Sequence, residues 1–127
     1  MKIINCTPHK ITVLSRKGVE QDSKKQFLAL PEGIEVLAEI EPSGVLPRVQ
    51  MSDTCVGDVQ GIPLHEVIYG NIENLPPVTG GTLLIVSGVV AAAAAKQGRK
   101  DVIAPGGLVR DKNNPGIVLG CLFLQKP

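Results

Sequence analysis

The sequence predicts an α+β fold made mainly of antiparallel strands, arranged as a strongly bent sheet or small β-barrel with one short alanine-rich helix. Three observations carry this prediction. Residues 34–41 alternate between apolar and mostly acidic side chains, as in a half-buried antiparallel strand. Gln60-Gly61 separates two strand-like runs, as in a hairpin with a two-residue turn. Residues 89–96 contain five consecutive alanines, the residue with the highest helix propensity.

Length and composition favour one domain covering residues 1–127. The chain has 127 residues, 43% of them hydrophobic, and no linker-like tract divides it. This apolar content excludes intrinsic disorder. The net charge of +1 and the three aromatic residues argue against binding a nucleic acid polymer.

Targeting and redox signals predict a cytoplasmic protein without a membrane span. The longest apolar stretch, 82–95, is too short to cross a bilayer, and residues 1–5 lack the apolar core of a signal peptide. The three cysteines, Cys6, Cys55 and Cys121, are an odd number without CxxC spacing. We therefore expect reduced thiols.

The first half of the chain contains short strands and turns. Strands are expected at 2–5 and 11–14, joined by a turn at Pro8, and a polar loop is expected over 15–25. Residues 45–51 should pair back on the strand at 34–41 as a sheet edge, because Pro47 cannot donate to a ladder.

The second half begins with the hairpin 56–59 and 62–69, followed by a connection over 70–81 with one helical turn at 72–75. Residues 82–86 are continuously apolar and predict a strand buried on both faces. The helix follows, and 101–104 is expected to be a short strand ended by Pro105-Gly106-Gly107. Residues 108–111 and 117–124 should form the last hairpin.

Charge is distributed unevenly along the chain. Residues 1–27 carry a net +4, residues 28–75 a net −7 and residues 76–127 a net +4. A patchy solvated surface is one interpretation, and self-association of complementary surfaces is the other. The all-apolar alanine helix also leaves two alternatives. It packs within one subunit, or it forms an interface between subunits. We expect a homo-oligomer.

The start of the alanine helix is the first candidate binding site. Ser87 is expected to be the N-cap, and Lys96 and Gly98 suit the C-terminal end. A helix N-terminus has free N–H groups and a partial positive charge, so it attracts phosphates and carboxylates. Gly88 lets a ligand approach the backbone. The alternative is a capped helix with water at its end, because no GxGxxG or Walker sequence is present.

Arg99 and Arg110 are the other candidate ligand-binding residues. A guanidinium group recognises phosphate or carboxylate with two parallel hydrogen bonds. Each arginine also has an aspartate close in sequence, Asp101 and Asp111, so local ion pairing is the alternative.

No catalytic, metal or cofactor site is predicted. His9 and His65 are the only histidines, and Cys6 with His9 has no second pair to complete a zinc site. A cysteine–histidine nucleophile pair has no local sequence signature here. The roles of both histidines and of the three cysteines stay open.

Three segments together resemble a family of small uncharacterised phage and prophage proteins. They are the Thr7-Pro8-His9 turn, the Ile85-Val86-Ser87 strand end before the alanine-rich helix, and the Arg99-Lys100-Asp101-Val102 segment leading through Pro105-Gly106 to Leu108-Val109-Arg110-Asp111. The resemblance implies a viral accessory protein and carries over no active residues.

We therefore expect a non-catalytic binder of a small anionic, nucleotide-like ligand, held by Ser87, Gly88, Arg99 and Arg110. Sequestration of a host-defence signal is the role that the phage resemblance implies. The first alternative is a protein–protein interaction module that inhibits a host protein and uses the edge strand 45–51. The second is a small hydrolase that uses His65-Glu66 or a cysteine with a histidine.

Overall fold

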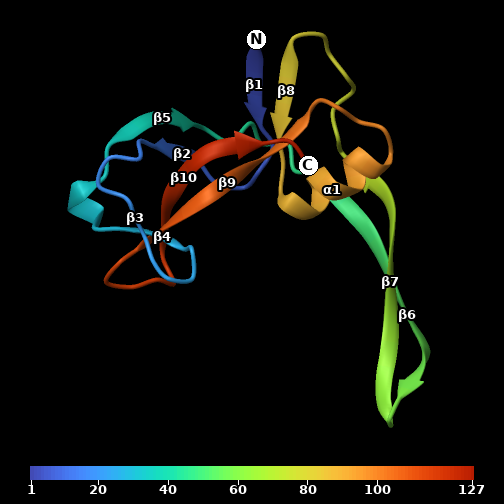
Figure 1. Cartoon of the computed structure of the whole chain (residues 1–127). Coiled ribbons are helices and arrows are strands. Elements are labelled where there is room, and N and C mark those ends of the chain that lie inside the picture. The colour runs from blue at the N-terminus through green and yellow to red at the C-terminus, as the bar shows by residue number, and fades with distance from the viewer.

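The structure, a computed structural model, describes residues 1–127 and consists of a β-rich body and one projecting hairpin (Figure 1). The strands of the body and its two helical segments are β1 (Lys2–Asn5), β2 (Ile11–Leu14), β3 (Glu20–Gln21), β4 (Phe27–Ala29), a 3-10 turn (Pro31–Gly33), β5 (Val36–Ile40), β8 (Thr82–Ile85), α1 (Gly88–Lys96), β9 (Val102–Asp111) and β10 (Val118–Gln125). The projecting hairpin consists of β6 (Arg48–Val59) and β7 (Ile62–Glu73).

The body is one mixed sheet in the order β1-β8-β9-β10-β2-β5, with β3 and β4 attached to β9 through β4. β9 is central because its first residues pair with β8, its middle with β10 and its last residues with β4. Four strand pairs in the molecule are parallel and four are antiparallel. The α+β class with many strands and one short helix is confirmed.

The barrel alternative is wrong. Only a single bridge, between Asn5 and Pro42, joins the two outer ends of the sheet. Closure into a barrel needs a continuous ladder between the first and last strands, and β1 and β5 share none.

Two small cores hold the body together. The larger lies between α1 and the β1–β8–β9 part of the sheet, where Val86, Ala94 and Val102 are almost completely buried. The smaller lies under β4 and β9, around Leu14, Ala29 and Val109. The expected burial of the 82–86 strand is confirmed, since its last three residues are buried. The alanine side chains let α1 pack closely on the sheet, with Ala93 and Ala94 inward.

Several expected elements differ from those observed. β5 pairs with β2 and not with residues 45–51, and it lies at the sheet edge with Val36 and Leu37 exposed. Residues 72–75 form no helical turn, because Ile72 lies within β7. β9 continues through Pro105-Gly106-Gly107, where the Phe123 ring occupies the space that side chains at the two glycines would need.

The β6–β7 hairpin is longer than the sequence predicts. The turn at Gln60-Gly61 is confirmed, and both residues have positive φ, 53° and 80°, as a type I′ turn requires. Strand pairing extends from Val59–Ile62 at the tip to Arg48–Glu73 at the base. We call residues 48–73 the arm. At about 3.3 Å per residue, each 12-residue strand is roughly 40 Å long.

Candidate functional site

The start of α1 is capped by the chain itself. The Ser87 hydroxyl accepts a hydrogen bond from the Val90 N–H at 3.4 Å, so the expected N-cap is confirmed. Gly98 at the other end has φ of +86°, as expected for the residue that ends a helix. The cap uses one of the free N–H groups that would otherwise attract an anion.

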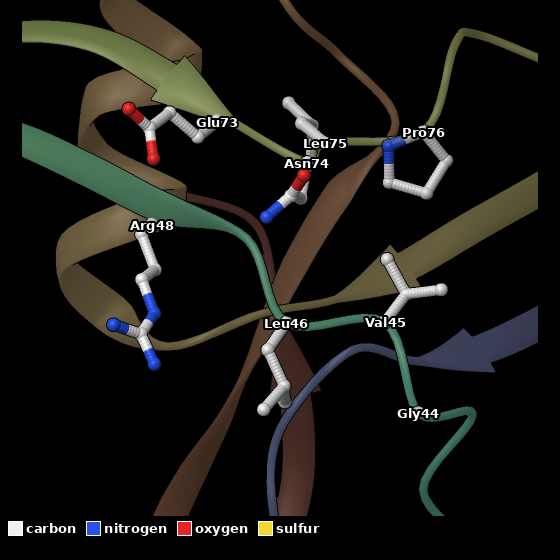
Figure 2. Close-up of a pocket in the computed structure, with 8 residues that line it drawn as sticks. All are labelled: Gly44, Val45, Leu46, Arg48, Glu73, Asn74, Leu75 and Pro76. Atoms are coloured by element: carbon white, nitrogen blue, oxygen red, sulfur yellow. The ribbon is translucent and has the colours of Figure 1, made fainter.

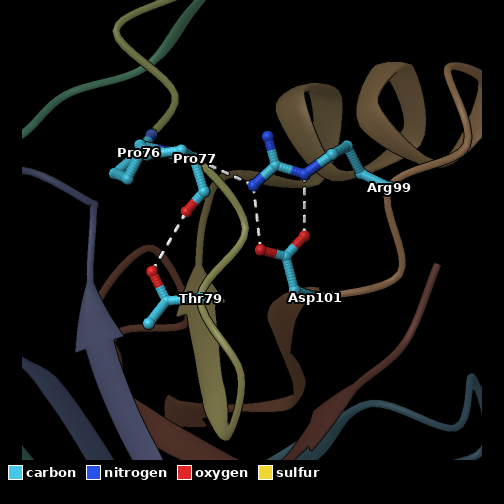
Figure 3. A network of polar contacts seen from close by, with 5 residues as sticks. All are labelled: Pro76, Pro77, Thr79, Arg99 and Asp101. Carbon is cyan, nitrogen blue, oxygen red and sulfur yellow. Dashed lines mark hydrogen bonds and ion pairs between the residues drawn. The ribbon is translucent and has the colours of Figure 1, made fainter.

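Arg99 holds together the end of α1 and the connection that follows the arm. Its Nε and Nη2 donate to the two carboxylate oxygens of Asp101 at 2.9 and 2.8 Å, and Nη2 also donates to the Pro76 carbonyl at 2.8 Å (Figure 3). The side chains of Arg99 and Asp101 are only 21% and 11% exposed. Local pairing, the alternative stated for Arg99, is therefore the arrangement present.

This ion pair shifts the pKa of both partners. Hydrogen bonds from Arg99 lower the pKa of Asp101, and the bonds to Asp101 raise the pKa of Arg99 above its ordinary value. The shift gives the pair a pH-dependent contribution to stability. A carboxyl group whose pKa is lower in the folded state stabilises the fold above its unfolded pKa, about 3.9. That contribution is lost as pH falls through the folded pKa.

We predict that Asp101→Asn lowers the free energy of unfolding by about 2 kcal/mol at pH 7, because the guanidinium loses a charged acceptor. The difference between the two proteins should begin to shrink below about pH 4, where Asp101 of the unfolded parent takes up a proton, and should disappear as pH falls through the lowered pKa of the folded state. Urea unfolding at a series of pH values measures it. A difference that stays constant down to pH 3 would contradict this role for the ion pair.

The four predicted ligand-binding residues do not gather around one cavity. Gly88 and Arg99 lie near opposite ends of α1, whose nine residues span about 13 Å. Arg110 lies seven residues along β9 from Ile103, the partner of Ile85, so it is roughly 23 Å farther along the strand. Its Nη1 donates to the Pro115 carbonyl at 3.1 Å. Binding of an anionic ligand stays a prediction.

Gly88 and Arg99 do line two adjoining cavities along the outer side of α1. A cavity of about 370 Å³ extends from Gly88 past Ala92, and one of about 340 Å³ includes Arg99 and Lys100. The two share Ala95, Lys126 and Pro127. We call them together the helix groove. Its walls are mostly small apolar side chains. Two exposed lysines, Lys100 and Lys126, line the cavity that includes Arg99.

The largest cavity is an open depression of about 720 Å³ at the base of the arm (Figure 2). Arg48 and Glu73, cross-strand partners at the base of the arm, lie on one side of it, and Val45 and Leu46 form much of its apolar surface. No ion pair joins Arg48 to Glu73, because the Glu73 carboxylate accepts from Gln50 at 2.8 Å. The sequence predicted a partner-binding edge strand over 45–51, which overlaps this depression, but it paired that strand with 34–41, whereas its residues from Arg48 onward belong to β6 and pair with β7.

A histidine, an aspartate and a cysteine meet on one face of the arm. Nδ1 of His65 lies 2.9 Å from Oδ1 of Asp53, and Cys55 is the cross-strand partner of His65. The hairpin turn places such pairs opposite one another, but the register also depends on a bulge between Cys55 and Gly57 that the sequence does not predict. The Cys55 thiol donates to the Gly57 carbonyl at 3.5 Å.

This cluster has no cleft around it. The His65 and Asp53 side chains are 50% and 60% exposed, and none of the larger cavities includes them. A hydrolase needs walls that orient a substrate and donors that stabilise the transition state. The structure therefore has a histidine–aspartate pair that the hydrolase hypothesis could use, but no substrate-binding cleft around that pair. No group of three or more His, Cys, Asp or Glu side chains is placed to share a metal ion.

The other two thiols are buried in the body. Burial raises the pKa of Cys6 and of Cys121, which disfavours their reactive thiolate forms. His9 is exposed, and its backbone carbonyl, not its ring, accepts hydrogen bonds from Asn5 and Thr7. Cys6 is therefore a buried packing residue, and the backbone of His9 is part of the hydrogen-bonded turn after β1.

The arm is the most unusual surface of the molecule. Every residue from Met51 to Gly70 is exposed, and the apolar ones include Val59, Ile62 and Leu64 at 54%, 66% and 49% exposure. In β7 the side chains of Ile62, Leu64, Glu66 and Ile68 alternate onto one face, which Val59 joins as the partner of Ile62. We call these five residues the arm face.

Fold and site together define an α+β protein with a projecting, apolar β-arm. Comparison with protein-family models, with curated proteins and with solved structures found no match. The resemblance to phage and prophage proteins therefore stays a prediction. No helix in the structure is long and apolar enough to span a membrane.

Proposed function

We propose that this chain is a non-catalytic interaction module that binds other protein chains, including copies of itself, through the arm. One observation carries the proposal. The chain exposes 8207 Å² of surface, whereas a compact monomer of 13.4 kDa exposes about 6,500 Å². The surplus, about 1,700 Å² for one chain, is about twice the roughly 800 Å² that each partner buries in a standard protein–protein interface.

The composition of the arm supports binding of protein. Contiguous exposed apolar surface on a protein is typical of interaction sites. The arm presents such surface on both faces, with Ile62 and Leu64 on one, and Met51, Val67 and Tyr69 on the other. Burial of one such side chain contributes about 1.5–3 kcal/mol, so a partner that covers a few of them gains substantial affinity.

The arm also needs support that its own chain does not supply. A two-stranded ribbon in water is marginally stable on its own, and every residue from 51 to 70 is exposed. Only the base is anchored, where Val49 and Ile72 pack on the larger core and Gln97 donates to the Gly70 carbonyl at 3.1 Å. Docking on another chain would order the ribbon and cover its apolar side chains.

The test compares association of the intact chain with that of a chain whose arm is cut back to the Ser52–Ile68 pair. Sedimentation velocity across a concentration series measures the mass of each. We expect the intact chain to associate and the shortened chain to remain a monomer. An intact chain that is monomeric throughout the series would overturn the proposal.

A small anion in the helix groove is the second candidate function, because exposed Lys126 lines both cavities and exposed Lys100 lines the second. We predict that a nucleotide at one hundred times its dissociation constant stabilises the chain by about 2.7 kcal/mol. A thermal-shift screen of nucleotides and cyclic nucleotides measures this, and Lys100→Ala should weaken the response. Equal melting temperatures with every ligand would remove the candidate.

A further inference from the structure

We infer that the arm face of one copy docks in the helix groove of a second copy, with Glu66 against the lysines at the rim of that groove. The inference rests on the proposed function and names the surface that receives the arm. It follows from the charge of the arm, from the direction in which the arm projects and from the charges around each cavity.

Charge favours the body of another chain over another arm. The arm, residues 48–73, contains four acidic residues and one arginine, Arg48 at its base, a net charge of −3. The rest of the chain contains twelve basic and eight acidic residues, a net charge of +4. Two arms in contact would bring like charges together, whereas an arm on a body brings opposite charges together.

The arm does not reach the helix groove of its own chain. Its base lies beside α1, and from there the hairpin extends away from the body, so that the tip is its most distant part (Figure 1). Gln60 and Gly61 at this tip are separated from the base by the whole length of the ribbon. A groove that receives the tip therefore belongs to a different copy.

The helix groove has more unpaired basic side chains than any other of the larger cavities. Lys100 and Lys126 line it, both are exposed, and neither forms an ion pair within the chain. The depression at the base of the arm instead combines one arginine with one glutamate. In the cavity beside β10, the charged residue is Lys10, which already pairs with Glu39 at 3.3 Å. The cavity between Tyr69 and α1 has one lysine, Lys96.

The helix groove also offers an apolar surface that a flat ribbon can approach closely. Gly88, Ala92 and Ala95 lie on the outward side of α1, and their small side chains leave room for larger ones. On the arm face, Glu66 lies two residues from Leu64 and two from Ile68, so the carboxylate is flanked by apolar side chains. In the proposed contact, those apolar side chains cover the alanines and Glu66 meets the lysines.

Reciprocal charge reversal tests this contact. Glu66→Lys and Lys100→Glu each place like charges in the interface, and we expect each variant alone to associate at least tenfold more weakly than the parent. In a mixture of the two variants, the reversed arm of one meets the reversed groove of the other, and the unchanged arm meets the unchanged groove. Opposite charges then face each other in both contacts, so association should return. Both side chains are exposed, and unchanged melting temperatures would show that each variant folds.

The matched controls are Glu35→Lys and Lys24→Glu, which make the same charge changes at exposed positions outside both surfaces. They should associate like the parent, alone and mixed. Sedimentation velocity at low and at 0.5 M salt adds a second readout, since screening should weaken association of the parent and relieve the repulsion in the single reversals.

The outcomes separate the inference from the proposed function. Rescue in the mixture supports both. If the shortened arm abolishes association but neither reversal changes it, the arm binds elsewhere and this inference is overturned while the proposed function stands. If the shortened arm associates as well as the parent, both are overturned.

Discussion

Removing the outer part of the arm should convert an associating protein into a monomer without unfolding the body. The variant deletes 53–59 and 62–67 and retains Gln60-Gly61 as the turn between Ser52 and Ile68, which are cross-strand partners in the intact arm. Every deleted residue is exposed. The anchoring residues Val49 and Ile72 stay in place against the larger core.

The stability of the body should change little because no buried side chain is lost. Surface changes away from packed features alter the free energy of unfolding by about 0.5 kcal/mol or less. We therefore expect the melting temperature of the dilute protein to move by only a few degrees, while the dissociation constant rises by more than a hundredfold. Light scattering and sedimentation velocity measure the association, and calorimetry measures the stability.

A full-length control separates apolar contact from the length of the arm. Replacing Val59, Ile62, Leu64 and Ile68 by threonine preserves β-branched or strand-compatible side chains and removes apolar surface from the arm face. This variant should lose association to a similar degree. Retention of the parental mass by the shortened chain would show that association uses other surfaces, such as the exposed edge strand β5.

Asn5→Ala should destabilise the body more than any other single polar substitution described here, by about 3–5 kcal/mol. Asn5 is only 1% exposed, and it joins three segments through its side chain. Its Nδ2 donates to the carbonyls of His9 and Ile40 at 2.8 and 2.9 Å. Its Oδ1 accepts from the N–H and the hydroxyl of Thr7 at 2.9 and 2.6 Å.

The size of this effect follows from the cost of unsatisfied polar groups. Truncation removes the acceptor of the Thr7 N–H and one donor from each of two carbonyls, of which the His9 carbonyl keeps the Thr7 hydroxyl. A buried polar group left without a partner costs about 1–3 kcal/mol. Urea unfolding measures the loss. Asn5→Asp is the matched control for the donor, because it keeps the size of the side chain and the accepting oxygen. It places a negative charge against two carbonyl oxygens, so we expect it to be comparably destabilising. A loss below 1 kcal/mol for Asn5→Ala would contradict the argument.

Local patterns determined much of the secondary structure. The apolar run at 82–86, the Ser87 cap, the alanine helix and the Gln60-Gly61 turn each depend on neighbouring residues, and each is present in the structure. These features are encoded by helix propensity, capping and turn conformation, which act over a few residues. The α+β class followed from them.

Tertiary structure decided which strands pair and which side chains meet. β5 has an alternating sequence that predicts a half-buried strand, yet Val36 and Ala38 on its apolar face are exposed because no layer covers the sheet edge. The arm extends well beyond its predicted bounds, since cross-strand pairing continues to Arg48 and Glu73. Burial and pairing depend on residues distant in the sequence, and period-two alternation does not reveal them.

For the candidate site, the sequence by itself determined the acidic middle segment between two basic ones, and this charge pattern underlies the expected self-association. It did not determine that Arg99 is held by Asp101 and Pro76, or that Arg110 lies far from the helix start. It also did not determine that the acidic segment projects as an exposed arm. The physical reason is that charge is carried by each residue, whereas its availability to a partner depends on how the whole chain packs.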